Sequence, residues 1–556
     1  MKDKATIEAM FERLDGERSE SLDFARKCAR LAGKPWILPD EQWSSENKSR
    51  RSRGEDQIPP NFQSVLQRGT SSLKGHFLTN GFPSDSPWFN FTIPGRWLYD
   101  KEIPDDEKVE TQNDLFMAQL ILTSLFESAP IAKDTKDRGL RASMGFRSSI
   151  GRFVDNLLVT GDGLIFMRDD FRLRTFRRDW YVTKRDTCGD VLCHVTKEMK
   201  EPLELSDKDI ETVGFRKSEL EEKEAVDRQT KLYTYPEWQP YSRNWVIVQE
   251  MNGKVFNEFE EDVSPYISVP FSHTDGDDYG HGFVELNYGD GSTFDRIREA
   301  CVEYAAMASK FHPCVGIGSN VRPKDLTAPS GTPIMETRMG TNGKPTDVGF
   351  LTLDKLNDFT IVKEVHDLIR TDLGKAALLE SESAPKGEAG RHSTAWIMSF
   401  AELERITGGH YPLITESLQM GLIRRGAHQA MNPRPTPEIP RPVPLIRKFN
   451  LQKVEINVLT GLAAMERDRK RQKLIELAQV MQALGPEIQQ RLDPAVFIDV
   501  YQRYSGFYEP GLVKSEQKIK QEQQRALAMQ AQQVAAEEGV KVLAETAKAG
   551  LIPQAA

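Results

Sequence analysis

The chain has 556 residues, of which 38% are hydrophobic and 28% are charged, a composition typical of a multi-domain globular protein. Its 74 basic and 83 acidic residues give a net charge of −9, which argues against tight general affinity for nucleic acid, because that affinity is built from many Lys and Arg contacts to phosphate. The five cysteines are scattered and odd in number, so no disulfide framework is expected. No secretory signal and no run of about 18 apolar residues is found. We therefore expect a reducing cytoplasm, or a particle assembled there.

The first half of the chain mixes helical and strand patterns. Apolar residues at three- and four-residue steps predict helices at 5–31, 61–78, 106–128 and 135–160. Alternating patterns predict strands at 88–93, 163–168, 178–185, 191–197, 229–236, 246–250 and 265–270. The charged segment 198–227 is predicted to be helical, and the polar segment 41–60 a loop whose basic run at 48–53 is either solvated or in contact with phosphate. The fold class predicted is α+β, with an antiparallel sheet edged by helices.

A helix, an excursion, a second helix and a polar loop organise the middle of the chain. Helical periodicity predicts helices at 294–311 and 360–379. The segment between them is rich in Pro and Gly, which predicts short strands and turns rather than helix. A polar loop at 380–394 leads into a further helix. Two long helices around a projecting segment suit a spindle better than a catalytic cleft.

Three carboxylates mark one face of the first of these helices. Asp295, Glu299 and Glu303 recur at four-residue spacing, so they share a face. They are either a catalytic set or a solvated acidic ridge. The second interpretation is favoured, because no His or Lys in the helix is placed to tune their pKa values.

The last part of the chain is predicted to be mostly helical. A helix at 395–430 is expected to bend near Gly408-Gly409, and six prolines at 432–444 predict an extended strap. Helices are also predicted at 460–484, 494–504 and 515–550. The last of these is rich in Gln, Ala, Glu and Lys and has little to bury alone, so it is expected to need neighbouring copies of itself.

Motifs for catalysis, cofactors and metals are missing. The segment from Gly340 to Lys344 has the wrong spacing for a phosphate-binding loop, and no zinc-protease, serine-hydrolase or dinucleotide motif is found. The acidic loop 273–282 fails as a calcium loop, because Leu286 stands where a Glu is required. Cys188 and Cys193 lack two further zinc ligands. The sequence therefore predicts no enzyme, no cofactor and no metal.

Basic groups in the excursion and the polar loop are candidates for contact with DNA backbone, although each alone is an ordinary surface charge. In the excursion these are Arg322, Lys324, Arg338 and Lys344, and in the loop Lys386, Arg391 and His392.

Several blocks in a fixed order resemble the portal, or head-to-tail connector, proteins of short-tailed bacteriophages. The blocks are Pro265-Tyr266-Ile267 with Pro270, Tyr279-Gly280, Tyr288-Gly289-Asp290, Glu402-Leu403-Glu404 with Gly408-Gly409 and Tyr411, and Thr460-Gly461-Leu462 with Ala464, Arg467, Lys473 and Leu474. Phe82-Pro83 with Pro87-Trp88-Phe89, and Arg185-Asp186 with Gly189, also match. The resemblance covers nearly the whole chain, and it departs most in segment 198–227 and in the proline strap.

This resemblance implies a portal fold assembled as a dodecameric ring around a DNA channel. Its parts would be a wing at 1–290, stem helices at 291–312 and 359–379, a clip at 313–358, a channel loop at 380–394, a long wing helix and strap at 395–459, a crown at 460–512 and a C-terminal barrel helix and tail at 513–556. The ring would sit at one capsid vertex of the virion, after assembly in the host cytoplasm, with capsid and scaffold proteins, the terminase motor and a tail adaptor as partners. No membrane is implied.

The sequence leaves two questions open. Asp295, Glu299 and Glu303 either line the channel, where an acidic wall would keep the duplex centred, or lie on the stem exterior or between subunits. The alternative function is that of a scaffold or internal virion protein without a DNA channel, because such a protein would share the acidic, Ala- and Gln-rich C-terminus.

Overall fold

The computed structural model of the chain describes most of its first half and several elements of its second half. The described residues are 6–39, 61–83, 88–92, 105–128, 145–217, 220, 228–308, 356–377, 410–433, 444–446, 454–458 and 462–483, with short pieces between 313 and 350 and between 497 and 501. The chain divides into two compact units, the first made of residues 1–108 and 117–466 and the second of residues 109–116 and 467–556.

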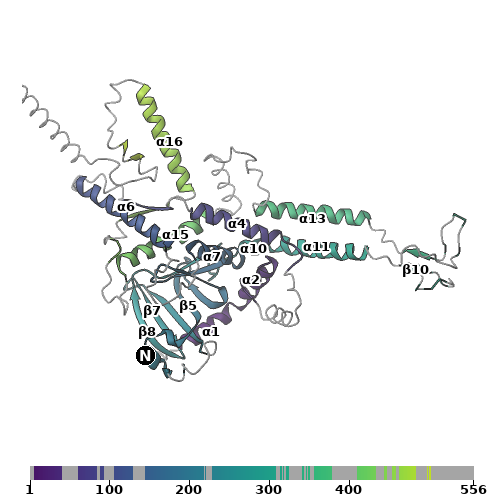
Figure 1. Ribbon diagram of the computed structural model, residues 1–556, viewed down its shortest axis with the longest axis horizontal. Coiled ribbons are helices and arrows are strands. Elements are labelled where there is room, and N and C mark those ends of the chain that lie inside the picture. Colours follow the sequence, from purple (N-terminus) through teal and green to yellow (C-terminus); the bar gives the residue numbers. More distant parts are fainter. Residues whose placement is uncertain are drawn as a thin grey trace, which may run out of the picture. The chain divides into compact units, whose positions relative to one another are not determined.

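An antiparallel five-stranded sheet in the order β4-β5-β6-β7-β8 is the largest sheet of the first unit (Figure 1). Its strands are β4 (Tyr181–Arg185), β5 (Val191–Lys200), β6 (Thr230–Gln239), β7 (Asn244–Met251) and β8 (Lys254–Glu261). Each pairs with its neighbour in sequence, so the sheet is a meander. Gly189 has a φ of 86°, a left-handed conformation that favours glycine and closes the β4–β5 turn.

Helices cover both faces of this sheet. Helix α1 (Ile7–Glu17) begins at Thr6, whose hydroxyl accepts a hydrogen bond from the Ala9 N–H. Phe11 of α1 packs against Tyr233 of β6. The preceding residue, Leu232, points to the other face and packs against Val213 of helix α8 (Asp207–Val213). The sheet is therefore buried on both sides near its middle.

A second, three-stranded sheet packs beside the first. It has the order β3-β2-β9, from β2 (Asp162–Met167), β3 (Leu173–Phe176) and β9 (Tyr266–Pro270). Leu164, Phe176 and Tyr266 of this sheet share a core with Tyr181 of β4, which joins the two sheets. Helix α7 (Phe146–Thr160) lies against β3, where the Asn156 side chain donates a hydrogen bond of 2.8 Å to the carbonyl oxygen of Phe176.

The remaining elements of the first unit tie distant parts of the chain together. They are α2 (Ser19–Leu31), α4 (Val65–Gly81), β1 (Phe89–Thr92), the 3-10 turns η1 (Arg178–Trp180) and η2 (Pro202–Glu204), α10 (Phe283–Leu286), α11 (Tyr288–Ala308), β10 (Pro313–Val315), β11 (Val348–Phe350), α13 (Leu356–Ala376), α15 (His410–Met431) and β12 (Glu455–Val458). Strand β1 pairs with β12, which comes more than 350 residues later in the chain. The Arg425 guanidinium of α15 pairs with the buried Glu261 carboxylate at the end of β8.

Most described residues of the second unit belong to two helices. Helix α6 (Asp105–Ser128) runs through both units, and α16 (Leu462–Ala483) begins in the first unit and continues in the second. Helix α16 confirms the helix predicted at 460–484. The helix predicted at 515–550 lies outside the described residues.

The mixed, helix-rich α+β class is confirmed, but two local predictions are wrong in part and further strands were not predicted. Residues 198–200 belong to strand β5 rather than to a helix, whereas Asp207–Val213, Lys217 and Leu220 in the rest of the predicted segment are helical. Strand β8 was missed, as was β3. The predicted strand 178–185 begins as a 3-10 turn.

Candidate stem and clip, and a buried polar network

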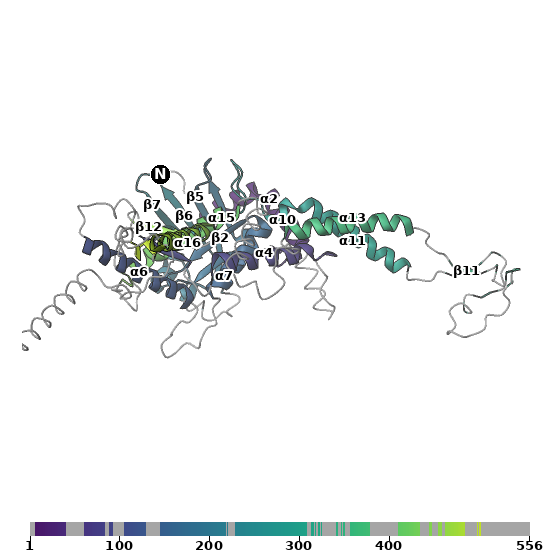
Figure 2. The same cartoon turned by 90° about the horizontal axis from the view of Figure 1, so that it is seen from above.

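Helices α11 and α13 lie side by side as an antiparallel pair in both views (Figures 1 and 2). The ring of Phe294, which is fully buried, stacks on the ring of His366 with a centroid distance of 4.6 Å and an interplanar angle of 30°. At the end of α13, Ala377 packs so closely on Gly69 of α4 that a Cβ on Gly69 would lie 2.5 Å from the Ala377 Cβ. These contacts fix the face that α11 and α13 share, and the side on which α4 supports them.

Helix α11 begins earlier than its periodicity predicts. It starts at Tyr288 rather than at residue 294. The glycines of this first turn weaken the helical signal, since glycine is a poor helix former. Gly291 is required by packing, because a Cβ there would lie 2.6 Å from a methyl group of Leu66.

Asp295 is engaged by backbone groups. Its Oδ1 accepts hydrogen bonds of 2.8 Å from the backbone N–H groups of both Phe62 and Gln63. The Gln63 side chain in turn accepts a hydrogen bond of 3.1 Å from the Leu66 N–H in the first turn of α4. Asp295 therefore holds the entry of α4 against α11, a role that four-residue spacing cannot reveal.

Glu299 and Glu303 are exposed. Neither makes an ion pair with any residue that the structure describes. Glu303 follows Phe294 by about two and a half helical turns, so it lies on the face of α11 opposite α13. Two of the three predicted ridge residues thus form an open acidic face, and the third is bonded to the chain itself.

The segment that connects α11 to α13 begins with strand β10 and ends with strand β11, which pair in antiparallel orientation. Pro313, Cys314 and Val315 of β10 pair with Phe350, Gly349 and Val348 of β11. The short strands predicted there are present at both ends. Arg322, Lys324 and Arg338 lie between these strands and are exposed. Lys344, and the loop residues Lys386, Arg391 and His392, lie outside the described residues.

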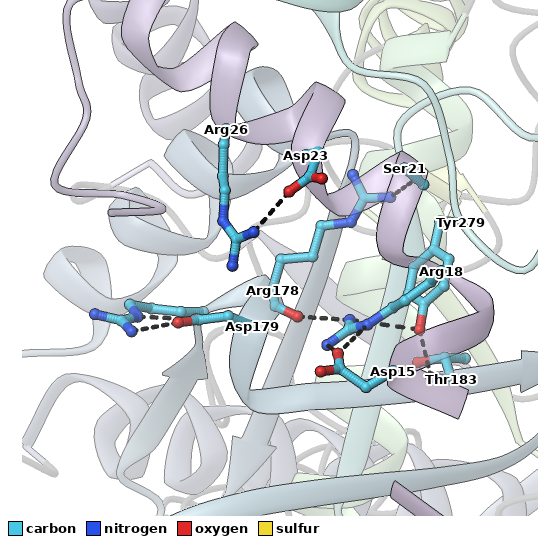
Figure 3. A network of polar contacts seen from close by, with 10 residues as sticks. Asp15, Arg18, Ser21, Asp23, Arg26, Arg178, Asp179, Thr183 and Tyr279 are labelled. Carbon is cyan, nitrogen blue, oxygen red and sulfur yellow. Dashed lines mark hydrogen bonds and ion pairs between the residues drawn. The ribbon is translucent and has the colours of Figure 1, made fainter. Parts of the chain in front are cut away.

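A network of buried arginines joins α2, the sheets and the segment that leads to α10 and α11 (Figure 3). The guanidinium groups of Arg18 and Arg178 lie over the ring of Tyr279, at 5.5 and 4.9 Å from its centroid. Arg18 donates a 2.6 Å hydrogen bond to the Arg178 carbonyl oxygen and pairs with Asp15 at 2.7 Å. Arg178 donates to the Thr160 carbonyl oxygen and to Ser21 Oγ. These hydrogen bonds and the Tyr279 ring compensate the burial of both cations, although the buried Arg178 Nε has no hydrogen-bond partner among the described residues.

A fully buried carboxylate lies in the same region. Asp162 accepts a 2.9 Å hydrogen bond from the Tyr181 hydroxyl and has Arg185 at 3.5 Å. Burial raises the pKa of Asp162, and the neighbouring Arg185 charge opposes that shift. Sequence reasoning missed this network, although Arg185 and Tyr279 fall in two of the blocks that carry the family resemblance.

The described residues offer no site for a metal ion. Among them, no three His, Cys, Asp or Glu side chains form a group that could hold one. Cys188 is exposed, whereas Cys193 is buried and burial raises its thiol pKa to about 11. Asp278 of the acidic loop accepts a hydrogen bond from the Arg185 N–H and pairs with Lys184.

No helix in the described part of the chain is long and apolar enough to cross a bilayer.

Comparison with known proteins decides the family. Residues 4–512 match the model of the bacteriophage head to tail connecting proteins. The chain belongs to this family. Similar relatives are the portal proteins of Escherichia phage T7, 26% identical over 98% of this chain and 95% of the relative, and of Enterobacteria phage T3, 27% identical over 86% and 82%. These relatives confirm the resemblance to portal proteins of short-tailed phages.

Solved structures give a weaker likeness. A chain in the neck of an empty GTA particle has a TM-score of 0.34 and 10% identity, over 78% of this chain and 88% of that one.

Proposed function

We propose that the chain is the portal subunit at one capsid vertex, forming a dodecameric ring whose channel passes DNA during packaging and ejection. The family match over residues 4–512 carries this proposal. In the ring, α11 and α13 form the stem, residues 313–358 the clip, and residues 380–394 a channel loop. The chain acts as a structural protein rather than an enzyme.

The open acidic face of α11 supports a channel that guides DNA without gripping it. Duplex DNA carries one phosphate charge per roughly 1.7 Å, so a basic wall would bind it and stall its movement. Glu299 and Glu303 would instead repel the duplex from every side, over a range of about 8 Å at physiological salt. Asp295 contributes less, because its carboxylate is bonded to the backbone at Phe62 and Gln63. The competing arrangement places this face outside the stem or between subunits.

Basic residues supply local contacts where the channel narrows or meets partners. In the loop, Lys386, Arg391 and His392 would make weak phosphate contacts, and Gly387 and Gly390 would give the backbone freedom to move. In the clip, Arg322, Lys324, Arg338 and Lys344 would face the terminase motor first and the tail adaptor later. The wing would contact capsid and scaffold proteins.

Imaging of the purified chain by negative-stain electron microscopy tests this function. We expect end-on class averages with twelvefold symmetry and a central hole. Closed particles without a hole, at concentrations where the chain self-associates, would instead favour the scaffold or internal virion protein.

A further inference from the structure

The two edges of the five-stranded sheet differ. At the β4 edge, side chains occupy outward N–H groups: the Thr183 N–H donates to the Tyr279 hydroxyl at 3.0 Å, and the Arg185 N–H donates to Asp278 Oδ1 at 2.9 Å. At the opposite edge, β8 pairs with β7 on one side, and no described strand pairs with its other side. Among the described residues, side chains therefore close the β4 edge, whereas no strand covers the outer edge of β8.

The side chains of β8 define what such a strand must carry. Glu258 and Glu260 are both exposed and lie two residues apart, so they share one face of the strand. Glu258 makes no ion pair with a described residue. Among the described residues, Glu260 accepts a hydrogen bond only from the neutral Asn244 amide. Between them, Phe259 points to the other face, where it is half-buried.

This pattern disfavours pairing of two β8 edges from two copies, since like charges directly opposite each other are destabilising. It favours a strand with Lys or Arg at every second position, opposite Glu258 and Glu260, and apolar or β-branched residues between them, over Phe259. Main-chain hydrogen bonds would supply affinity, and the alternating side chains would supply specificity.

We infer that the open edge of β8 binds an extended segment of a partner protein in which basic residues alternate with β-branched ones. Strand β8 belongs to none of the segments proposed as stem, clip and channel loop. It gives the proposed wing a docking site of defined chemistry.

A synthetic peptide tests the site directly. Fluorescein-labelled Thr-Arg-Val-Lys-Val-Arg-Thr is titrated with the full-length chain at low salt, and binding is followed by fluorescence anisotropy. We expect saturable binding that weakens by about tenfold or more in the variant Glu258→Lys/Glu260→Lys, because two attractive cross-strand pairs become repulsive. The neutral variant Glu258→Gln/Glu260→Gln should weaken binding by a smaller factor. Thermal unfolding of each variant confirms that it is folded.

Two controls separate strand pairing from simple charge attraction. The variant Glu20→Lys/Glu476→Lys makes the same change in net charge at exposed helix positions and should bind the peptide within about twofold of the parent. A peptide N-methylated at alternate residues keeps its charges but loses donors on one edge, so it should bind far more weakly. Equal binding of the methylated peptide, or equal loss in the control variant, would overturn the inference.

The basic run at 48–53 of a second copy is the main rival occupant. If replacing Lys48, Arg50, Arg51 and Arg53 by Ser makes the chain bind the peptide more tightly, that run already competes for the edge, and the inference of a separate partner is wrong. Unchanged affinity in this variant supports it.

Discussion

The Asp295 carboxylate accepts a hydrogen bond of 2.8 Å from the backbone N–H of Gln63, at the entry to helix α4. This contact separates Asp295 from Glu299 and Glu303, with which it shares a helix face and a four-residue spacing. One carboxylate is structural, whereas the other two are open to solvent. The distinction can be tested because the two roles predict different consequences of the same substitution.

The variant Asp295→Ala should be less stable than the parent by about 1–3 kcal/mol, because two backbone N–H groups lose their acceptor. Urea unfolding measures the loss. The matched variant Glu299→Ala should change the free energy of unfolding by no more than about 0.5 kcal/mol, as expected for an exposed site. Equal effects at the two positions would contradict the assignment.

The double variant Glu299→Gln/Glu303→Gln should keep its thermal midpoint and its ability to form rings while altering DNA passage, since only the charge of the open face is removed. Packaged genome per particle is the readout. Packaging at the parent level would place this face outside the channel or between subunits.

Deleting residues 384–391 of the proposed channel loop should leave assembly intact and impair packaging or genome retention, since the deletion removes the loop's hinge glycines and two of its basic residues. Ring yield and DNA content per particle are measured together. Particles of normal infectivity would show that the loop has no such role.

The variant Arg178→Ala should destabilise the fold by about 2–4 kcal/mol, because it removes a buried side chain and leaves hydrogen-bond acceptors unpaired. Its neighbour is the control: Arg177 is partly exposed and pairs with Asp179, so Arg177→Ala should cost about 1 kcal/mol or less. Comparable losses for the two variants would refute a special role for the Arg178 contacts around Tyr279.

His194 makes stability fall in mild acid. Burial lowers its pKa to about 3, and its Nδ1 lies 2.9 Å from Thr183 Oγ1. In the unfolded chain a His has a pKa near 6.5, so below that pH the unfolded state binds the extra proton and gains stability. This residue alone should lower the free energy of unfolding by about 2 kcal/mol between about pH 7 and pH 5.

Urea midpoints of the parent and of His194→Gln at the two pH values measure this term. The variant should lose less stability on acidification than the parent. His281, whose pKa is raised chiefly by its hydrogen bond to Glu285, works in the opposite direction and stabilises the fold at lower pH. An identical pH dependence in parent and variant would show that His194 is not the group responsible.

Local patterns predicted several elements correctly, because the helical period or the apolar run lies within the element itself. Helix α16 and strand β2 fall within one or two residues of the predicted positions. Strand β8 was missed because its charged, mostly exposed residues show no buried face, and it is held by pairing with β7. The charged segment that begins at Glu198 was predicted to be helical. Glu198 instead lies in β5 and forms an ion pair with Arg174 of β3.

The site was predicted less completely than the fold, because its contacts join distant residues and leave no local pattern. Spacing places Glu299 and Glu303 on one face, and the structure leaves them exposed. It cannot show that Asp295 meets Gln63, or that Arg178 and Tyr279 meet in the buried network, because both contacts join residues far apart in sequence. Contacts of this kind follow from the tertiary fold alone.

The orientation of α11 in an assembled ring decides whether its acidic face guides DNA. A cryo-electron microscopy reconstruction of the purified ring would locate the side chains of Glu299 and Glu303 relative to its axis. We expect a twelvefold ring in which both carboxylates face the lumen. A ring in which they face outward or pair with a neighbouring subunit would contradict the acidic channel wall, and the lack of any ring would contradict the channel itself.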